Sequence, residues 1–312
     1  MIVVVGSVNM DISVRVAALP LPGQTVLGAA AMIGLGGKGA NQAVAIARLL
    51  LDKVAPARLV ASVGRDAFGS EATKRLSIEE IDLQHLHHSP QPTGIALIGV
   101  DDHAQNSIIV APGANSDLEP RHVTPEVFSG AQVVCISLEI PKITWREAIR
   151  SARAVGALVV VNASPLNEVK PGDLEGTDVL VVNQLEAAAL GGEPALEGTA
   201  IGLTSARALQ RIAARVVVTL GAHGVIWAGE DDGCLAGLPV HATDTTGAGD
   251  TFCGALCVAL SEGATLPRAV SFANTAGALC ATRAGTTTAM PTRAEVEVFR
   301  GLESRESNFS AQ

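Results

Sequence analysis

The most constraining feature of the sequence is a regular alternation between short β-branched runs and longer amphipathic stretches. The runs are mostly apolar and lack a period of two, which is typical of strands buried on both faces. The stretches between them have the length of helices, and several begin at Ser, Thr, Asn or Pro. This alternation predicts an α/β fold, with a central, mostly parallel sheet covered by helices on both faces. The expected strands are residues 1–5, 58–63, 131–138, 157–162, 178–182 and 215–220, and the expected helices are 41–52, 70–77, 144–155, 203–214, 249–261, 266–282 and 292–302.

Two places break the alternation. Residues 11–16 and 24–33 form one apolar pair, and residues 93–100 and 106–110 form another, each joined by turn residues without a helix. The two pairs predict a small second sheet. Because they are far apart in the sequence, we expect a single domain over 1–312 with a discontinuous β-sheet lid formed by about 11–34 and 92–111. Lid strands have open edges, so a homodimer through them is expected.

Charge and hydropathy exclude several classes of protein. Twenty-two Lys and Arg against 31 Asp and Glu give a net charge of −9, the wrong sign for nucleic acid or an anionic membrane surface. Although 48% of the residues are hydrophobic, no apolar run reaches the roughly 18 residues of a membrane helix. The N-terminal segment has neither the basic region nor the long apolar run of a secretory signal. We therefore expect a cytoplasmic protein that binds neither nucleic acid nor membranes.

Cysteine and histidine spacing gives no metal motif. The five cysteines include no Cys-x-x-Cys pair, which favours reduced thiols. Cys253 and Cys257 are one helical turn apart and are interpreted as small packing residues. His85, His87 and His88 have no cysteine or carboxylate at a ligand spacing, which predicts a solvated loop.

The strongest chemical signal is a loop of small residues that runs directly into an apolar helix. Gly247, Ala248 and Gly249 let backbone N–H groups converge on a phosphate, and the helix N-terminus adds partial positive charge. Asp250 follows, where a carboxylate can accept the proton of an acceptor hydroxyl. The pattern predicts an anion hole with a base for phosphoryl transfer. The alternative is that Asp250 caps the helix and the glycines form a turn.

A second glycine-rich loop, residues 36–42, precedes the first expected helix. It is no Walker P-loop, because Lys38 is followed by glycine instead of the hydroxyl residue that binds a metal. Its amides and Asn41 suit the hydroxyl groups of an uncharged small molecule, and a hinge between lid and body is compatible with this role. Asn9 and Asp11 follow the first strand. A carboxylate there can accept two hydroxyl hydrogen bonds, as a vicinal diol requires, and the alternative is that both residues form a turn.

Together these motifs resemble the signatures of the ribokinase-like carbohydrate kinases, and the resemblance covers nearly the whole chain. It also includes residues 6–11, 22–25, 138–139, 183–186 and 219–224. The resemblance implies a three-layer α/β/α fold with a small β-sheet lid. It implies an enzyme that transfers the γ-phosphate of ATP to the 5-hydroxyl of D-ribose, giving D-ribose 5-phosphate and ADP. Mg²⁺ would be required and K⁺ would activate.

The resemblance also implies site residues. Asp250 would be the general base, beside the anion hole of Gly247, Ala248 and Gly249. The sugar would be held by Asn9, Asp11, Gly37, Lys38, Gly39, Asn41, Glu139 and Asp250. The nucleotide and its Mg²⁺ would be held by Asn183, Glu186, Thr219, Gly221, Gly224, Gly249 and Asn274. The K⁺ positions would be Asp244, Thr246, Cys280, Arg283, Gly285 and Ala289. Family members often carry serine where Ala289 stands, so one side-chain oxygen is missing there.

The residues leave other acceptors and other functions open. Another furanose or a nucleoside could be the acceptor, although a chain without Tyr and with two Trp offers little aromatic surface for stacking a base. A non-catalytic sugar-binding regulator would have no use for a base and an anion hole together. A nicotinamide dehydrogenase is disfavoured, because no Gly-x-Gly-x-x-Gly follows the first strand.

Overall fold

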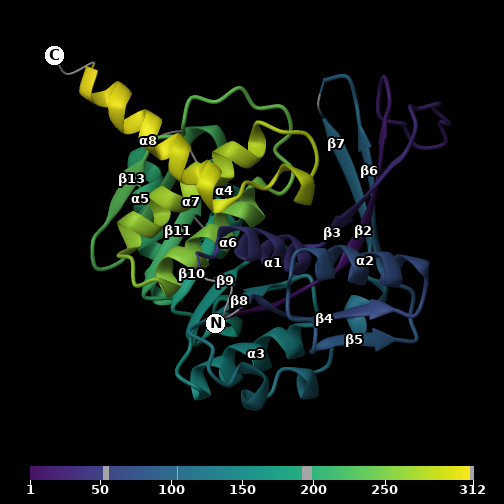
Figure 1. The fold of residues 1–312 in the computed structure, drawn as a ribbon, viewed down its shortest axis with the longest axis horizontal. Coiled ribbons are helices and arrows are strands. Elements are labelled where there is room, and N and C mark those ends of the chain that lie inside the picture. The colour runs from purple at the N-terminus through teal and green to yellow at the C-terminus, as the bar shows by residue number, and fades with distance from the viewer. Residues whose placement is uncertain (52–55, 104, 192–198, 310–312) are drawn as a thin grey trace.

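A computed structural model describes residues 1–51, 56–103, 105–191 and 199–309 (Figure 1). Their strands form two sheets, one of nine strands and one of four. The large sheet has the order β13 (Gly233–Leu235), β12 (Val225–Ala228), β11 (Arg215–Thr219), β10 (Val179–Asn183), β9 (Leu158–Asn162), β8 (Val133–Ser137), β1 (Ile2–Val5), β4 (Arg58–Gly64) and β5 (Leu86–Ser89). The small sheet has the order β3 (Met32–Gly36), β2 (Asn9–Arg15), β6 (Gly94–Val100) and β7 (Asn106–Ala111).

Helices cover both faces of the large sheet. The α-helices are α1 (Lys38–Leu49), α2 (Ala67–Ile78), α3 (Lys142–Ala154), α4 (Gln184–Gly191), α5 (Thr199–Ala208), α6 (Ala248–Ser261), α7 (Leu266–Ala281) and α8 (Arg293–Phe309). Short 3₁₀ helices lie in the connections: η1 (Gly113–Asp117), η2 (Pro120–His122), η3 (Pro125–Phe128), η4 (Pro171–Leu174), η5 (Leu209–Arg211), η6 (Gly221–His223) and η7 (Thr287–Ala289). In the part of the chain that is described, no helix combines the length and the apolar character needed to cross a bilayer.

The central strands are apolar at every position because both of their faces are buried. In β1, Ile2 and Val4 face the core under α1, α6 and α7, whereas Val3 and Val5 face the core under α3, α4 and α5. Neighbouring strands are parallel in the run β5, β4, β1, β8, β9, β10 and β11. Among the described pairs of this sheet, only those that involve β12 and β13 are antiparallel. The sequence-based prediction of a central, mostly parallel sheet between helical layers is confirmed.

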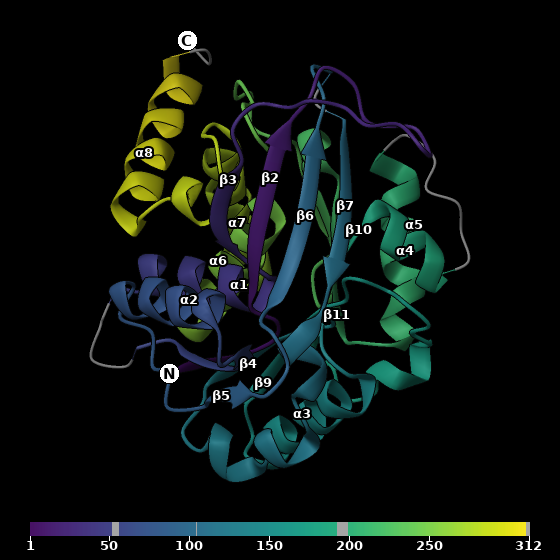
Figure 2. The same cartoon turned by 90° about the vertical axis from the view of Figure 1, so that its right-hand side faces the viewer.

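The small sheet stands at one end of the large one. Figure 2 shows β2, β3, β6 and β7 rising side by side from the edge at which α1 and α2 lie. Asn9 of β2 pairs with Gly36 of β3 on one side and with Gly94 of β6 on the other. Every residue of β7 is exposed, including Ile108 and Ile109. Both faces of β7 therefore carry apolar side chains that the described residues leave uncovered.

Helices α1 and α6 lie unusually close together. A Cβ added to Gly254 of α6 would lie 2.8 Å from the Cβ of Ala45 and 3.2 Å from the carbonyl oxygen of Gln42, both on α1. Only glycine permits this separation, because any larger residue would push the two helices apart.

Two sequence-based predictions are wrong. The strand expected over 24–33 begins only at Met32. Leu27 is 95% exposed, so its side chain has no packing partner that would stabilise an extended, paired conformation. The histidine loop is also wrong. His87 and His88 belong to β5, which pairs with β4, and the His87 ring stacks on His122 with ring centroids 3.7 Å apart.

Other elements had no signal. α4, β5, β12 and β13 were not predicted. Only five residues, 220–224, separate β11 from β12, so no α-helical pattern and no long loop marks the change of direction between these antiparallel strands.

Candidate active site

A polar cleft lies where the parallel strands of the large sheet end. Asn162, Asn183 and Thr219 are the last residues of β9, β10 and β11, and all three line it. Ligands of open α/β sheets bind at this carboxyl edge. The cleft has a volume of about 140 Å³, and its lining is Lys38, Asn162, Ser164, Val181, Val182, Asn183, Glu186, Thr219, Gly247, Gly249 and Asp250.

The small-residue loop enters the cleft at the start of α6. Gly247 precedes the helix with φ 77°, in the left-handed region that favours glycine. A Cβ at this position would also lie 3.0 Å from Cγ2 of Thr286. The unpaired N–H groups of the first turn of a helix, together with its dipole, favour an anion. The border of the cleft formed by Gly247 and Gly249 is therefore suited to a phosphate.

Asp250 lies one residue further along α6, and neutral amides from α1 hold both of its oxygens. Asn41 Nδ2 donates to Oδ2 at 2.9 Å, and Gln42 Nε2 donates to Oδ1 at 3.2 Å. Asp250 is 7% exposed and lines the cleft. Oδ1 of Asn41 is buried and has no hydrogen-bond partner among the described residues. An acceptor is thus left free beside the carboxylate.

Glu139 joins the end of β8 to the glycine-rich loop. Its Oε2 accepts hydrogen bonds from Ser7 Oγ at 2.5 Å and from the backbone nitrogen of Lys38 at 3.1 Å. The side chain of Lys38 lines the cleft. Burial acts to lower the pKa of Lys38, but the negative charges of Asp250, Glu139 and Glu186 outweigh it and raise the pKa. The lysine therefore stays charged next to the carboxylates.

Asp11 is half-buried among other acids. Burial, with the nearby charges of Glu139 and Asp250, raises its pKa from 3.8 to about 7. The side chain lies directly against Gly36, where an added Cβ would be 2.0 Å from Oδ1. Near neutral pH, Asp11 of the ligand-free protein therefore exists in both protonation states.

Asn9 is held by a residue that the sequence did not single out. Asn115 in η1 donates from Nδ2 to Oδ1 of Asn9 at 2.8 Å and accepts from the backbone nitrogen of Val8 at 2.9 Å. Gly37, with φ 87°, and Gly39 bring the second loop against the same segment, because a Cβ on either would clash with the backbone of residues 6–9. The residues predicted to hold the sugar are thus gathered around Asp250.

Asn183 and Glu186 form a reciprocal cap at the start of α4. The backbone nitrogen of Asn183 donates to Oε2 of Glu186, and the backbone nitrogen of Glu186 donates to Oδ1 of Asn183, both at 2.8 Å. Asn183, Glu186, Thr219 and Gly249 of the predicted nucleotide set line the cleft. The other three, Gly221, Gly224 and Asn274, are not among the described residues that line it, and Asn274 Nδ2 donates to the Ala236 carbonyl at 3.1 Å.

Most of the predicted cation positions meet behind the small-residue loop. Asp244 accepts from the backbone nitrogens of Thr246, at 2.9 Å, and Gly285, at 3.0 Å. Although burial acts to raise the pKa of Asp244, these hydrogen bonds lower it below its usual value. Cys280 Sγ lies 4.0 Å from the carbonyl oxygen of Thr246.

Two predicted cation positions have side chains that offer no ligand. Arg283 is paired with Glu295 at 2.6 Å, and the buried Ala289 carries only a methyl group, so each can contribute only its backbone carbonyl. The oxygen ligand that a serine side chain would supply at position 289 is therefore absent from this residue.

Arg48 was also missed. From the last turn of α1 its Nη1 donates to the carbonyls of Thr287, at 2.7 Å, and Met290, at 2.9 Å, while Nε and Nη2 bind Glu79. The guanidinium thus ties the segment around η7 to α1. The other residues that the sequence did not single out are Ser7, Gln42, Asn115, Asn162 and Ser164, because their roles depend on contacts between distant segments.

The geometry agrees with a family of known enzymes. The model of the pfkB family carbohydrate kinases matches residues 1–293. The chain belongs to the pfkB family. This assignment makes it a sugar kinase, a phosphotransferase, and the fold and the family resemblance predicted from the sequence are confirmed.

Relatives within the pfkB family agree along nearly the whole chain. A ribokinase of Bacillus subtilis is 34% identical over 302 residues, which cover 95% of this chain and 98% of that protein. The crystal structure of a Thermotoga maritima ribokinase superposes with a TM-score of 0.87 at 31% identity, covering 96% of this chain and 99% of the other. The Arabidopsis thaliana ribokinase, solved with ribose and ATP, has a TM-score of 0.84 at 29% identity and covers 95% and 96%.

Proposed function

We propose that this chain is a cytoplasmic, ATP-dependent ribokinase that phosphorylates the 5-hydroxyl of D-ribose to give D-ribose 5-phosphate and ADP. One observation carries the proposal. Asp250 stands at the start of a helix suited to phosphate, and Asn41 from the sugar-side loop binds it directly at 2.9 Å. A base shared by two such loops is what a hydroxyl-to-phosphate transfer needs. The ribokinases that cover this chain, one of them with ribose and ATP bound, support the same substrates.

On the sugar side, the acceptors outnumber the donors, as a polyol requires. Asp11, Glu139 and the free Oδ1 of Asn41 can accept hydrogen bonds from hydroxyl groups, whereas the charged Lys38 and the amide nitrogen of Asn9 can donate them. The ionised form of Asp11 can accept two hydroxyl groups at once, so sugar binding favours its carboxylate. Such an arrangement fits an unphosphorylated furanose, because a sugar phosphate would meet the acids here.

On the phosphate side, transfer proceeds at the start of α6. Asp250 accepts the proton of the 5-hydroxyl as its oxygen forms a bond to the γ-phosphorus, and the bond to the bridging oxygen of ATP breaks, leaving that charge on ADP. The N–H groups of the first turn of α6, after Gly247, stabilise the charge on the transferred phosphoryl group, and Lys38 lies on the cleft wall beside them.

The residues fit the two cations that such a kinase would use. Glu186 has a partly exposed carboxylate at the cleft, suited to the water shell of Mg²⁺, which would shield the charge of the ATP phosphates. Asp244, with the carbonyls of Thr246 and its neighbours, offers the oxygen ligands that K⁺ takes, and a cation there would add positive charge behind the anion hole.

We further propose that β2, β3, β6 and β7 form the lid and that two chains pair through it. Ile108 and Val110 on one face of β7 and Ile109 on the other are all exposed, and a monomer rarely leaves such apolar surface open. A second lid paired along the open edge of the sheet would cover these side chains.

The test is ADP release from ATP and Mg²⁺ with D-ribose, 2-deoxyribose, fructose, adenosine or fructose 6-phosphate, each with and without K⁺. K⁺-stimulated turnover on ribose is expected. Asp250→Ala should lower that turnover by roughly 10²- to 10⁴-fold with little change in ribose affinity. Asp231→Asn, at an exposed position, is the matched control. Preferred turnover on adenosine or another sugar would overturn the ribose assignment, and full activity in Asp250→Ala would show that Asp250 is not the general base.

A further inference from the structure

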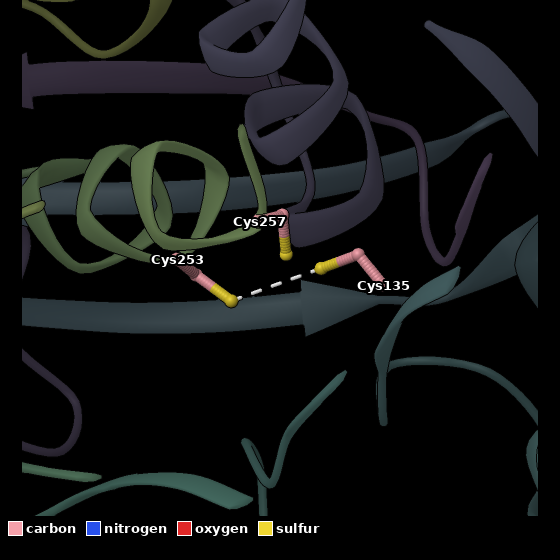
Figure 3. Close-up of side chains that lie close together, drawn as sticks. All are labelled: Cys135, Cys253 and Cys257. Carbon is pink, nitrogen blue, oxygen red and sulfur yellow. Dashed lines mark hydrogen bonds between the residues drawn. The ribbon is translucent and has the colours of Figure 1, made fainter. Parts of the chain in front are cut away.

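Three cysteines from two elements, α6 and β8, lie close together (Figure 3). Cys135 is on β8, and Cys253 and Cys257 are on successive turns of α6. All three have no exposed surface, and their sulfur atoms lie within 4.8 Å of one another. The sulfurs of Cys135 and Cys253 are 3.7 Å apart, too far for a disulfide bond, and the thiols are free. Packing alone does not require three sulfurs to converge on one point.

The spacing of the sulfurs matches a coordination sphere. With a metal–sulfur bond of roughly 2.3 Å, three sulfurs around one ion lie about 4 Å apart. The observed spacing needs only sub-ångström adjustments of side chains. Among the described residues the group contains no histidine or carboxylate and no fourth ligand, so it lacks the four ligands of a structural zinc site. An all-sulfur set of low coordination selects soft cations, of which copper(I) is the biological example.

We propose that Cys135, Cys253 and Cys257 form a binding site for a soft monovalent cation of the copper(I) class. Each sulfur that bonds to the ion does so as a thiolate, and its proton leaves to the solvent. The positive charge of the ion offsets part of the negative charge that these thiolates bring into the buried site.

Without an ion the thiols of the cluster are protonated. The hydrogen bond with Cys135, followed by burial and the charge of Asp250, raises the pKa of Cys253 well above its usual value. The ion must therefore displace these protons, and its attraction to the nearby negative charge of Asp250 offsets part of that cost.

The site is coupled to Asp250 by one side chain. Cys135 Sγ donates to Oε1 of Gln42 at 3.3 Å, and Nε2 of the same amide donates to Oδ1 of Asp250 at 3.2 Å. An ion on Cys135 takes away the S–H donor that orients Gln42, and it also restrains α6 one turn after Asp250. We therefore expect an occupied site to reduce turnover, a consequence that rests on the proposed role of Asp250.

The binding test uses the full chain, reduced and free of oxygen, with Cys234→Ser removing the exposed thiol. Copper(I) is supplied from a chromogenic chelator, and uptake is read from the loss of chelator colour. One ion per chain is expected. Cys135→Ala, Cys253→Ala and Cys257→Ala should each weaken binding by roughly 100-fold, whereas Cys280→Ala, a buried thiol outside the cluster, should not. Wild-type affinity for copper(I) in the three variants, or loss of binding in Cys280→Ala, would overturn the site.

Two further measurements do not depend on how the variants fold. X-ray absorption of the copper-loaded chain should give only sulfur neighbours at roughly 2.3 Å, and nitrogen or oxygen neighbours would refute the assignment. Zn²⁺, which prefers four ligands, should bind far more weakly than copper(I), and equal binding would contradict the soft, low-coordinate assignment. The coupling to Asp250 is tested by kinetics. Turnover on ribose should fall at least tenfold when copper(I) is loaded and return when a chelator removes the ion. Unchanged turnover of the loaded enzyme would refute the link through Gln42, and the rate of the metal-free enzyme tests the kinase activity separately.

Discussion

The raised pKa of Asp11 makes a quantitative prediction about folding. The pKa of Asp11 is 3.8 for an ordinary, solvated aspartate, as in the unfolded chain, and about 7 in the folded chain, so ionisation of Asp11 opposes folding. The difference of about three pH units, at ~1.4 kcal/mol for each, corresponds to roughly 4 kcal/mol once the group is fully ionised. Because the pKa is raised on folding, the effect on the free energy of unfolding is destabilising. It is absent below pH 3.8, grows as the pH rises towards 7 and is complete above that.

Asp11→Asn removes the charge and keeps the shape of the side chain. The free energy of unfolding of the variant, minus that of the wild type, should therefore grow by roughly 2–3 kcal/mol between pH 5 and pH 8. Urea denaturation of the ligand-free proteins at pH 5, 6, 7 and 8 measures this difference, with the exposed Asp231→Asn as the control for loss of one charge. In the same variant the affinity for ribose should fall roughly 10- to 100-fold, because a hydroxyl bound to a charged acceptor contributes about 1.5–3 kcal/mol.

The pH dependence decides whether the reasoning is right. A constant difference between Asp11→Asn and wild type from pH 5 to pH 8 would mean that burial and the charges of Glu139 and Asp250 do not act on Asp11 as described. A variant less stable than wild type at pH 8 would have the same meaning.

Two other regions give predictions of their own. Arg48→Met removes the donors to the carbonyls of Thr287 and Met290, so half-maximal activation should need roughly tenfold more K⁺ while the KM for ribose stays the same; a K⁺ titration with unchanged midpoint would sink this role. Ile109→Lys should convert a dimer to a monomer in size-exclusion chromatography with light scattering, whereas Val298→Lys, equally exposed on α8, should not, and a dimer that survives Ile109→Lys does not form through β7.

The sequence predicted the parts of the fold that depend on local pattern. Central strands such as β8 and β10 are continuous apolar runs because both faces are buried, and the glycine loops mark the entries to α1 and α6. Where a short segment owes its conformation to a distant partner, the pattern was silent. β5 exists because it pairs with β4, and β12 because it pairs with β11.

The site follows the same division. Asp250 and Asn41 stand in recognisable loops, but Asn115 reaches Asn9 across 106 residues, and Cys135 meets Cys253 across 118. No spacing in the sequence encodes either contact. The charge environment of Asp11 is equally hidden, since it arises from Glu139, just after β8, and Asp250 on α6, which only the folded chain brings near.

The tight contact between α1 and α6 at Gly254 bears on how enzymes of this kind can diversify. Helix α1 carries the amides that bind Asp250 and helix α6 carries Asp250 itself, and Gly254 leaves no space in which one helix could slide over the other. The part of the site formed by α1 and α6 is therefore inherited as a single unit, whereas exposed strands of the small sheet, such as β7, are free to change. We expect that transplanting those strands between two relatives exchanges their acceptor preference. Chimaeras that take α1 from one relative and α6 from the other should lose activity on the acceptors of both parents.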